Sequence, residues 1–467
     1  MAAKAKKATV LSPEEKLKDA LVPVEQQPYA VPDNWCWVRF GILADDMADG
    51  PFGSNLKTEH YTSKHEVRII QLSNIGDEGW KDDNVKFTTF EHVKTIARSI
   101  VKPGNIVIAK MMPAGRAIIC PNDEKMYVLS SDAVKMVPVK DMDVKFLVYA
   151  INSQFFRNLV QENTQGITRA RTSIKKLKTY PFILPPLPEQ HRIVARIESL
   201  FAKLDEVKEK AQAVVDGYED RKAAILHKAF TGELTAKWRK EHGISIDSWE
   251  KRAFERCIVK MQNGLSKRTG DIGTPFIVLR LANLSDDGII ADDLREIRLT
   301  DDECAKYGLE ENDVIMVRVN GSKENVGKQF IVPKNENWAF CDHIIRIRYI
   351  EELLPQYMYF FSKSEKYKVY VRDNMVSSAG QNTISRKGMS NLVVSFPVIE
   401  EQHQIVDLLT YLLEQQKQVK SAAESVLDQI DTMKKSILAR AFRGELGTND
   451  PADEPAIELL KRMLREK

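Results

Sequence analysis

The stretches that decide the fold are residues 185–235, which begin PPLPEQHRIV and end AFTGELT, and residues 397–447, which begin PVIEEQHQIV and end AFRGELG. They align without a gap at a constant offset of 212 residues. Both contain Glu-Gln-His, at residues 189–191 and 401–403, and both end with Ala-Phe-x-Gly-Glu-Leu. Solenoid repeats have periods of about 20–50 residues, so this longer offset indicates one duplicated unit rather than an array.

Each stretch carries the apolar pattern of a long coiled-coil helix. Apolar residues recur at alternating spacings of three and four over about five heptads, which is typical of a helical seam. The seam positions are Ile193, Ile197, Leu200, Leu204, Val207, Ala211, Val214, Tyr218 and Ile225 in the first copy, and Ile405, Leu409, Leu412, Val419, Ala423, Val426, Ile430, Met433 and Ile437 in the second. Prolines precede each helix, and Gly232 and Gly444 follow them as end signals.

The two predicted helices are too long to be buried locally. A helix of about 40 residues is about 60 Å long, so it cannot bury its stripe within its own repeat. We predict that the two helices pair with each other as an antiparallel coiled coil. Arg221 and Gln416 interrupt the seam, and polar residues at such positions can fix the register. The alternative is that each helix packs only on the domain next to it.

The segments outside the helices, residues 33–184 and 236–396, share an order of elements. Each has short strand-like runs, then an aromatic-rich helical stretch, and then a polar loop. The matching pairs are the runs 67–75 and 276–284, the runs 105–110 and 312–318, the helical stretches 144–160 and 355–371, and the loops 164–171 and 377–383. We predict an α+β protein with a pseudo-twofold internal repeat, in which two similar domains are joined by the antiparallel coiled coil.

The two ends of the chain are predicted to form an N-terminal arm, residues 1–32, and a helical tail, residues 448–467. In the arm, Ser12 followed by Pro13 and two acidic residues is a helix start signal. The tail is amphipathic, so we expect it to pack on the coiled-coil region or on a partner subunit. The helices themselves are assigned to residues 185–235 and 397–447.

Composition and charge are those of an ordinary soluble globular protein. The net charge of +3 is close to neutral, so any DNA surface must come from local clustering of Lys and Arg. The five cysteines are scattered, which predicts neither a zinc site nor a disulfide framework and suits a reducing cytoplasm. No apolar run reaches the ~18 residues of a membrane span, and the N-terminus lacks the apolar stretch of a secretory signal. We expect a cytoplasmic protein.

Motifs for catalysis are missing from the sequence. It has neither the Asn/Asp-Pro-Pro-aromatic motif nor the glycine-rich cofactor loop of an adenine methyltransferase. Residues 321–329 resemble a phosphate-binding loop, but they have one residue too many between the glycines and Gln329 where a Mg²⁺-binding Ser or Thr belongs. We expect the equivalent His191 and His403 to pack at the helix starts or to bond to the other repeat. We predict no catalytic, metal-binding or cofactor-binding residues in this chain.

From about residue 30 onwards, the chain resembles the specificity subunit of type I restriction-modification systems. The resemblance rests on Asp49-Gly50-Pro51-Phe52-Gly53-Ser54, on the two Pro-x-x-x-Glu-Gln helix starts, and on the two Ala-Phe-x-Gly-Glu-Leu helix ends. It implies a non-catalytic subunit with two target recognition domains, each recognising one half of a split, asymmetric DNA site. The coiled coil would set the gap between the halves and dock two methyltransferase subunits.

The resemblance also implies which groups belong to partner subunits. A restriction-translocase subunit would join the complex, and S-adenosylmethionine, ATP and Mg²⁺ would bind to the partners rather than to this chain. The methylated atom would be N6 of adenine. Two alternatives are a stand-alone sequence-specific DNA-binding regulator and a coiled-coil scaffold, and neither would need two diverged domains of one fold.

DNA contact is expected from four loops at matching positions in the two domains, because Lys, Arg and polar side chains supply phosphate and base contacts. Two loops follow equivalent strands and two follow equivalent helices. The candidate residues are Lys110, Arg116, Arg169, Arg171, Lys175 and Lys176 in the first domain, and Arg318, Asn320, Ser322, Lys323, Gln381, Asn382, Arg386 and Lys387 in the second. The amides of Asn320, Gln381 and Asn382 are candidates for adenine edges. The guanidinium groups of Arg169, Arg171 and Arg318 are candidates for guanine or phosphate.

Overall fold

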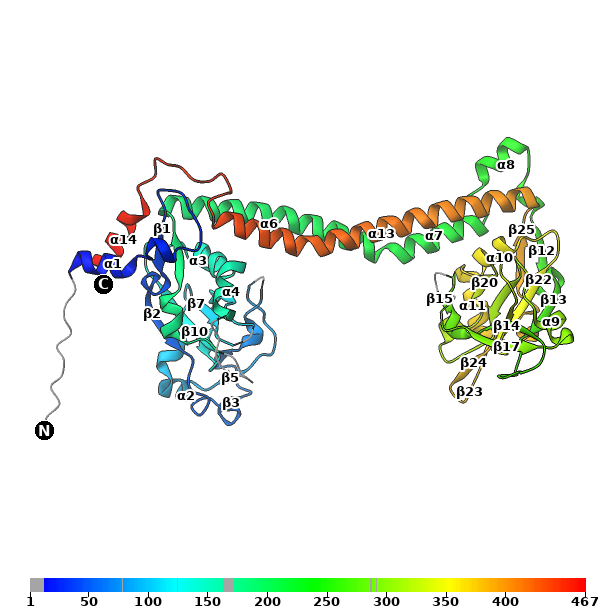
Figure 1. Cartoon of the computed structure of the whole chain (residues 1–467), viewed down its shortest axis with the longest axis horizontal. Coiled ribbons are helices and arrows are strands. Elements are labelled where there is room, and N and C mark those ends of the chain that lie inside the picture. The colour runs from blue at the N-terminus through cyan, green and yellow to red at the C-terminus, as the bar shows by residue number, and fades with distance from the viewer. Residues whose placement is uncertain are drawn as a thin grey trace. The chain divides into compact units, whose positions relative to one another are not determined.

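The computed structural model describes residues 12–77, 79–111, 113–123, 125–162, 171–285, 288–290 and 292–467. The chain divides into two compact units, which we call unit 1, formed by Met1–Lys210 with Val426–Lys467, and unit 2, formed by Ala211–Ser425. Each unit combines one mixed α+β domain with part of the long helices (Figure 1). The division therefore falls inside the helices rather than at their ends.

Three helices make up the helical pair. They are α6 (Leu187–Asp216), α7 (Tyr218–Phe230) and α13 (Ile399–Ala441). The expectation of one continuous helix in the first copy is wrong, because Gly217 separates α6 from α7. Glycine is among the poorest helix formers, and here a Cβ at position 217 would lie 2.5 Å from a guanidinium nitrogen of Arg221. The missing side chain thus leaves room for Arg221 to fold back onto the Val214 carbonyl.

In unit 1, α6 and α13 run antiparallel. Asp205 forms an ion pair with Lys434, with 2.8 Å between Oδ1 and Nζ. The same ammonium lies 5.4 Å from the centre of the Phe201 ring. Towards the start of α6, Arg192 Nε donates to the Thr448 carbonyl beyond the end of α13, at 2.8 Å. Residue numbers fall along one helix as they rise along the other, which confirms antiparallel pairing here.

In unit 2, α7 pairs with the first half of α13 in the same sense. Arg221 Nε donates to Gln416 Oε1 at 2.8 Å, and Lys420 Nζ lies 5.0 Å from the centre of the Tyr218 ring. The two polar interruptions of the seam are therefore partners of each other. A hydrogen bond between them is lost if either helix slides, so the prediction that they can fix the register agrees with this contact.

The centre of unit 1 is a four-stranded antiparallel sheet in the order β2-β10-β7-β8. Its strands are β2 (Ala44–Asp49), β7 (Ile106–Ala109), β8 (Ala117–Ile119) and β10 (Ala133–Pro138). Along β7, Ile106 and Ile108 face a core shared with the helices, whereas Val107 and Ala109 face a second core. This period of two with both faces buried explains why the strand is apolar throughout.

The second core of unit 1 lies under a five-stranded sheet in the order β3-β5-β4-β9-β6. These strands are β3 (Tyr61–Thr62), β4 (Val67–Ile70), β5 (Phe87–Thr88), β6 (Ile100–Val101) and β9 (Met126–Leu129), with β4 and β9 parallel. The remaining elements are the antiparallel pair β1 (Cys36–Arg39) and β11 (Pro181–Leu184), and the helices α2 (Phe90–Thr95), α3 (Val144–Ile151), α4 (Gln154–Glu162) and α5 (Ile174–Thr179).

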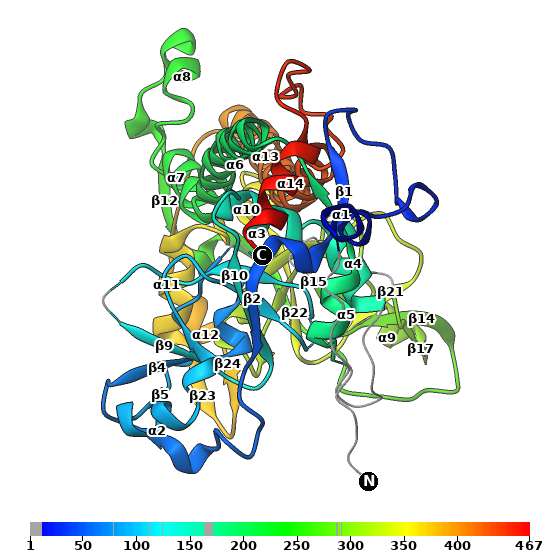
Figure 2. The same ribbon diagram turned by 90° about the vertical axis from the view of Figure 1, so that its left-hand side faces the viewer.

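The N-terminal arm and the C-terminal tail both belong to unit 1. Helix α1 (Pro13–Ala20) starts where predicted, because Ser12 Oγ accepts from Glu15 N while Ser12 N donates to Glu15 Oε2. Helix α14 (Ala456–Arg465) buries its apolar face in the same core as Trp37. The two helices lie side by side (Figure 2). The tail therefore packs against α1 and in a core that also contains Ile193 and Leu438 of the long helices, which agrees in part with the predicted location at the coiled-coil region.

Unit 2 repeats this architecture. Its four-stranded sheet has the order β13-β22-β18-β20, and β14 pairs in parallel with β21, as β4 does with β9. The strands are β12 (Glu250–Ala253), β13 (Ile258–Asn263), β14 (Thr274–Leu279), β15 (Leu284–Ser285), β16 (Gly288–Ile289), β17 (Arg295–Leu299), β18 (Val314–Val317), β19 (Val319–Asn320), β20 (Gln329–Ile331), β21 (Trp338–Phe340), β22 (Ile344–Tyr349), β23 (Val376–Ser378), β24 (Gln381–Thr383) and β25 (Val393–Phe396). The helices are α8 (Ala236–His242), α9 (Asp301–Tyr307), α10 (Pro355–Phe361), α11 (Glu365–Asn374) and α12 (Arg386–Met389). The predicted α+β fold with an internal repeat is confirmed.

Each predicted aromatic-rich helix is divided in two by a serine. The stretch 144–160 forms α3 and α4, and the stretch 355–371 forms α10 and α11. Ser153 Oγ accepts from Phe156 N, and Ser364 Oγ accepts from Tyr367 N, both at 3.4 Å. A serine that bonds the amide three residues on begins a new helix, so the interruption occurs at the same place in both domains. In the described part of the chain, no helix has the length and apolar character needed to cross a membrane.

Candidate nucleic-acid interface

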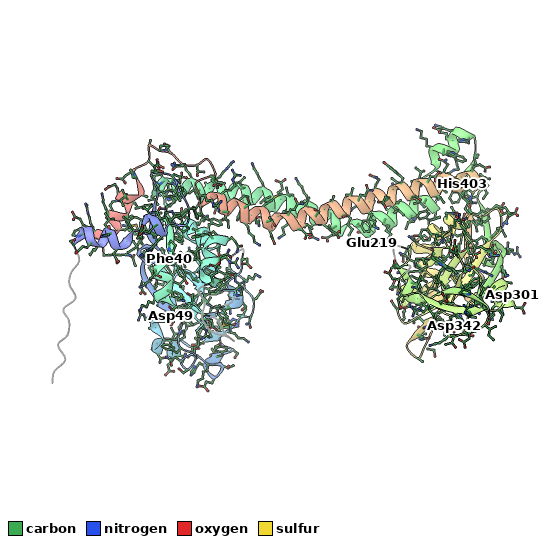
Figure 3. The ribbon with its side chains drawn as sticks, viewed as in Figure 1. Phe40, Asp49, Glu219, Asp301, Asp342 and His403 are labelled. Atoms are coloured by element: carbon green, nitrogen blue, oxygen red, sulfur yellow. The ribbon has the colours of Figure 1, made fainter. Side chains whose placement is uncertain are left out.

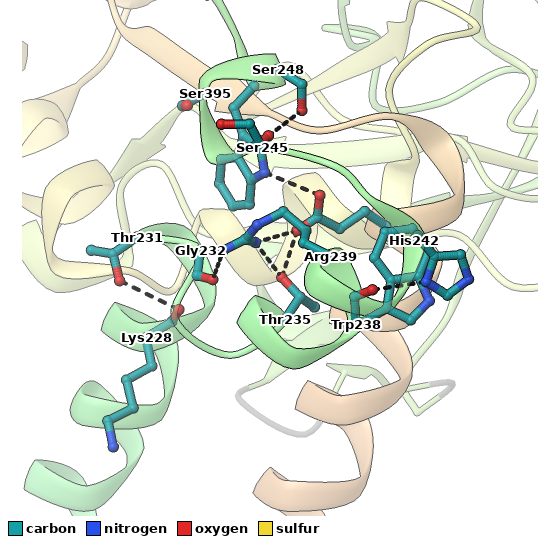
Figure 4. A network of polar contacts seen from close by, with 12 residues as sticks. Lys228, Thr231, Gly232, Thr235, Trp238, Arg239, His242, Ser245, Ser248 and Ser395 are labelled. Atoms are coloured by element: carbon teal, nitrogen blue, oxygen red, sulfur yellow. Dashed lines mark hydrogen bonds and ion pairs between the residues drawn. The ribbon is translucent and has the colours of Figure 1, made fainter.

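The repeated sequence motifs meet at both ends of the helical pair. In unit 2, Glu401 is fully buried and accepts hydrogen bonds from Thr235 Oγ1 at 2.6 Å, from Arg239 Nη1 and from Trp249 Nε1 at 3.2 Å (Figure 4). Thr235 directly follows the Gly-Glu-Leu end of the first helix. The end of one repeat therefore docks on the buried carboxylate at the start of the other.

Unit 1 uses the same arrangement with a different cation. Glu189 is fully buried and accepts from Thr448 Oγ1 at 2.6 Å and from Arg192 Nε at 3.1 Å. Thr448 follows the Gly-Glu-Leu end of the second helix, but Arg192 lies on the same helix as Glu189. Burial raises the pKa of Glu189, and the hydrogen bonds from Thr448 and Arg192 offset this only in part.

The glutamines beside these carboxylates join each helix start to the adjoining domain. Gln190 Oε1 accepts from Asp143 N at 3.0 Å, and Gln402 Oε1 accepts from Leu354 N at 2.9 Å. Both glutamine side chains are fully buried, whereas His191 and His403 are exposed. The two histidines therefore do not pack into the helix starts, which was one of their two expected roles, and the buried Glu-Gln pairs take that structural role. His191 Nε2 lies 3.7 Å from Asp143 Oδ2 of its own unit.

The two predicted loops of the first domain lie together. Thr172 N donates to the Lys110 carbonyl at 3.2 Å, and Met111 forms an antiparallel bridge with Arg171. The same contact recurs in unit 2, where Ile384 N donates to the Arg318 carbonyl at 3.0 Å. These equivalent hydrogen bonds bring together the loop after β7 and the segment before α5 in unit 1, and the loop after β18 and the segment before α12 in unit 2.

Two further segments, which sequence reasoning missed, complete each group. Lys110 N donates to Asp132 O at 2.9 Å in the β9–β10 turn, and Arg318 N donates to His343 O at 2.8 Å in the β21–β22 turn. The chain crosses the first of these turns at Gly50, directly after β2, and the second at Gly264, directly after β13. We call each group of four segments a loop cluster: the end of β2 or β13, the loop after β7 or β18, the β9–β10 or β21–β22 turn, and the segment before α5 or α12.

The glycine at the end of β2 and β13 is required by this crossing. A Cβ at Gly50 would lie 1.7 Å from the Ser130 carbonyl oxygen, and one at Gly264 would lie 2.1 Å from the Cys341 carbonyl oxygen. The amides of these glycines donate to equivalent residues, Ala133 and Ile344. The signal in the sequence was the match between Asp49-Gly50 and Asn263-Gly264, which the divergent residues that follow concealed.

The predicted basic residues of unit 1 are largely paired with acids. Lys110 Nζ lies 2.6 Å from Asp49 Oδ1, and Arg171 pairs with Asp132. Asp49 lies farther from the helices than Phe40 does (Figure 3). These two ion pairs mean that the cluster of unit 1 is not a simple basic patch.

The other candidates of unit 1 differ in exposure. Arg116 lies 3.8 Å from Asp77, which also pairs with Arg157 at 2.7 Å. Burial lowers the pKa of Arg116, and within the described residues its Nε has no hydrogen-bond partner. Lys175 is exposed and Lys176 is half-buried. Arg169 lies outside the described residues.

The candidates of unit 2 form a more open surface. Arg318 Nη1 donates to the Asp342 carbonyl at 3.4 Å, and Asn320 Oδ1 accepts from Ser322 N at 2.8 Å. Asp342 lies on the side of the domain away from the helices (Figure 3). The exposed candidates are Ser322, Lys323, Gln381, Arg386 and Lys387.

Asn382 does not fit its predicted role at an adenine edge. Its side chain is buried, its Nδ2 donates to the Gly321 carbonyl at 2.9 Å, and its Oδ1 accepts from Ser377 Oγ at 2.6 Å. These bonds join β24 to β23 and β19, so the amide is occupied in holding the sheet together. Gln381, its exposed neighbour on the hairpin, remains a candidate.

The side chains of Cys341, Asp342 and His343 lie close enough to hold a metal ion. Their ligand atoms are within 4.8 Å of one another. However, burial raises the pKa of the Cys341 thiol, and metals bind the thiolate. The three residues are also consecutive in a turn whose backbone already bonds the Arg318 loop, so we assign them to the loop cluster.

Comparisons with known proteins agree with this architecture. Residues 55–215 and 285–425 match the family model described as Type I restriction modification DNA specificity domain. The StySPI specificity subunit of Salmonella potsdam is 28% identical over 408 residues, which cover 85% of this chain and 86% of that protein. The EcoKI specificity subunit of Escherichia coli K12 is 26% identical over 410 residues, which cover 85% and 86%.

A solved structure extends the likeness to the fold. The HsdS subunit from Thermoanaerobacter tengcongensis superposes with a TM-score of 0.63 at 19% identity, covering 90% of this chain and 99% of that chain. The family model covers more than half of the sequence and matches once in each half of the repeat. The chain therefore belongs to the family of type I restriction-modification DNA specificity subunits.

Proposed function

We propose that this chain is the DNA-recognition subunit of a type I restriction-modification complex, and that it recognises a split, asymmetric site. The observation that carries the proposal is that one loop cluster is built twice, from equivalent backbone contacts, with different side chains. Equivalent frameworks with different side chains suit two half-sites of different sequence. The subunit itself is non-catalytic and directs its partners to the site.

The residues proposed to contact DNA are exposed or half-buried candidates in the loop clusters. In unit 1 they are Arg116, Arg171, Lys175 and Lys176. Lys110 holds the Asp49 carboxylate in the same loop cluster. In unit 2 they are Arg318, Asn320, Ser322, Lys323, Gln381, Arg386 and Lys387. Lysines and arginines at the rim supply phosphate contacts, which fix position but not sequence. Side chains inside the clusters supply contacts to base edges.

The partners are two methyltransferase subunits, one docked on each unit, and restriction-translocase subunits. Apolar side chains that remain exposed on the helices support docking. They are Val207, Val426 and Met433 in unit 1, and Tyr411 and Val419 in unit 2; all except Tyr411 are predicted seam positions, which the structure leaves 37–47% exposed. Exposed apolar side chains on the long helices offer contact area to a protein partner. S-adenosylmethionine, ATP and Mg²⁺ are bound by these partners, and methylation is at adenine N6.

The test is reconstitution of the chain with its methyltransferase subunits on a library of duplexes with randomised sequence. Methylated adenines are then mapped by sequencing. We expect a motif of two defined segments separated by undefined bases, seen only when the chain is present. The proposal is overturned if the methyltransferase modifies the same motif without the chain. If the chain alone bound the same DNA sequence as tightly as the complex does, the result would instead support a stand-alone regulator.

A further inference from the structure

Asp49 of unit 1 and Asn263 of unit 2 occupy the same place in their loop clusters. Asp49 is the last residue of β2 and lies opposite Val134 of β10, and Asn263 is the last residue of β13 and lies opposite Ile345 of β22. Each is exposed and precedes the glycine that crosses the neighbouring turn. The two units therefore present a carboxylate and an amide at one equivalent position.

The Asp49 carboxylate is the outer member of its ion pair. Its side chain is 51% exposed, whereas that of Lys110 is only 13% exposed, with 2.6 Å between the charged atoms. Lys110 is held in place by its own backbone, which bonds both Asp132 and Thr172. The largely buried ammonium thus holds the carboxylate in position, while about half of the Asp49 side chain stays exposed.

The neighbouring ion pair has the opposite arrangement. Arg171 is the outer member, with 42% of its side chain exposed, and Asp132 is the inner member at 20%. Both pairs belong to one cluster, because Lys110 N donates to Asp132 O and Thr172 N donates to Lys110 O. The cluster of unit 1 therefore presents one fixed acceptor group and one fixed donor group to a ligand.

This combination matches the edge of a G·C base pair in the major groove. Guanine presents two acceptors, N7 and O6, which suit a guanidinium, and cytosine presents the N4 amino group, which suits a carboxylate. A carboxylate has no proton to donate, so it disfavours the acceptors O6 and N7 of guanine, O4 of thymine, and N7 beside the amino group of adenine, and it repels phosphate. An exposed, fixed carboxylate in a DNA-binding cluster is therefore suited to a base rather than to the backbone.

Resting on the function proposed above, we infer that Asp49 determines specificity by accepting a hydrogen bond from the N4 amino group of a cytosine in the first half-site. Arg171 contacts guanine in the same half-site. Asn263, at the equivalent position, has an amide that can pair with both N6 and N7 of adenine. The first half-site thus contains a G·C pair whose requirement disappears when the carboxylate is replaced.

The first arm of the test changes the protein. The complex with methyltransferase subunits is prepared with Asp49→Asn, and with Asn263→Asp as a matched control in which the same exchange is made in the other unit. We expect Asp49→Asn to lower methylation of the original site by about 5- to 150-fold and to relax one cytosine position of the first half-site. Asn263→Asp should alter the second half-site only.

The second arm changes the DNA and needs no variant protein. Each cytosine of the first half-site is replaced in turn by 2-pyrimidinone, which lacks the 4-amino group, and binding to the wild-type complex is measured. At one cytosine position, the substitution should weaken binding of the wild-type complex by a similar factor. The inference is overturned if no position responds, or if an active Asp49→Asn complex keeps the original motif. By contrast, a wild-type complex with no split motif would overturn the proposed function itself.

Discussion

Glu401 is a fully buried carboxylate whose partners all come from the segment that follows the first helix. Removing the cation from such a pair leaves an uncompensated buried charge, which costs about 3–5 kcal/mol. We expect Arg239→Ala to destabilise unit 2 by this amount. Lys237→Ala on the same helix is the control, because its side chain is 91% exposed. Hydrogen exchange in the first turns of α13 should accelerate in the first variant and stay unchanged in the second.

Glu189 allows a prediction about pH. Its pKa is raised by burial, so the folded chain binds this proton more readily than the unfolded chain does. Its contribution to stability therefore falls as the pH rises from the ordinary glutamate pKa to the raised value. Glu189→Gln, which stays neutral, should be better tolerated relative to wild type at pH 7 than at pH 4.5. Thermal unfolding at both pH values checks this, and an equal loss at both would contradict it.

The prediction for unit 2 concerns the contribution of Arg318 to DNA binding. It lies at the end of β18, where its backbone bonds both neighbouring segments of the cluster. Arg318→Ala should weaken binding to sites with an intact second half-site by about 5- to 150-fold, because one good base contact is lost. Base changes in the first half-site should weaken DNA binding by the variant as much as they weaken DNA binding by the wild type. Loss of complex assembly with unaltered DNA recognition would count against the assignment.

At the residue scale, the sequence identified two of the four segments in each loop cluster but not what each side chain does there. Lys110 and Arg171 were identified by their charge, yet their acidic partners Asp49 and Asp132 come from segments distant in the chain. Asn382 was chosen by residue type, but its hydrogen bonds hold a hairpin. Only the folded structure decides whether a polar group faces a ligand or a neighbouring strand.

At the scale of elements, heptad spacing predicted the two helices and their antiparallel pairing. It did not predict the division at Gly217, because glycine at one seam-flanking position does not alter the apolar pattern. Strands buried on both faces, such as β7 and β18, were also identified correctly. The serines that divide the aromatic-rich helices were missed. The apolar residues keep a helical spacing before and after each serine, so the spacing does not show where one helix ends and the next begins.

The hydrogen bond between Arg221 and Gln416 should couple the two helices of unit 2. Removing one partner leaves a polar group in the seam without its hydrogen bond, which costs about 1–3 kcal/mol. We expect the double variant Arg221→Ala with Gln416→Ala to lose less free energy of unfolding than the sum of the losses in the two single variants. A double-mutant cycle on chemical unfolding measures the difference. Strictly additive costs would mean that the pair does not fix the register.

At the scale of the whole molecule, the duplication was evident from the sequence alone, and the recurrence of strand order and loop contacts follows from it. The spacing between half-sites should depend on the length of the helices. Removing one heptad from α6 together with the facing heptad of α13 shortens the pair by about 10 Å, at 1.5 Å per residue. That length corresponds to about three base pairs of DNA.

We therefore expect the paired deletion to shorten the undefined gap of the methylated motif by about three base pairs. Deleting the heptad from α6 alone is the matched control, because it separates Arg221 from Gln416 and should abolish activity. An active paired deletion with an unchanged gap would show that the helices do not set the spacing.

The proposed function requires that this chain alone determines which DNA sequence its partners modify. The most direct measurement is a genome-wide map of N6-methylated adenines in the host, with and without the gene for this chain. We predict a split motif, methylated on both strands, that disappears when the gene is removed and the methyltransferase gene is left intact. An unchanged map, with the methyltransferase still expressed, would contradict the account.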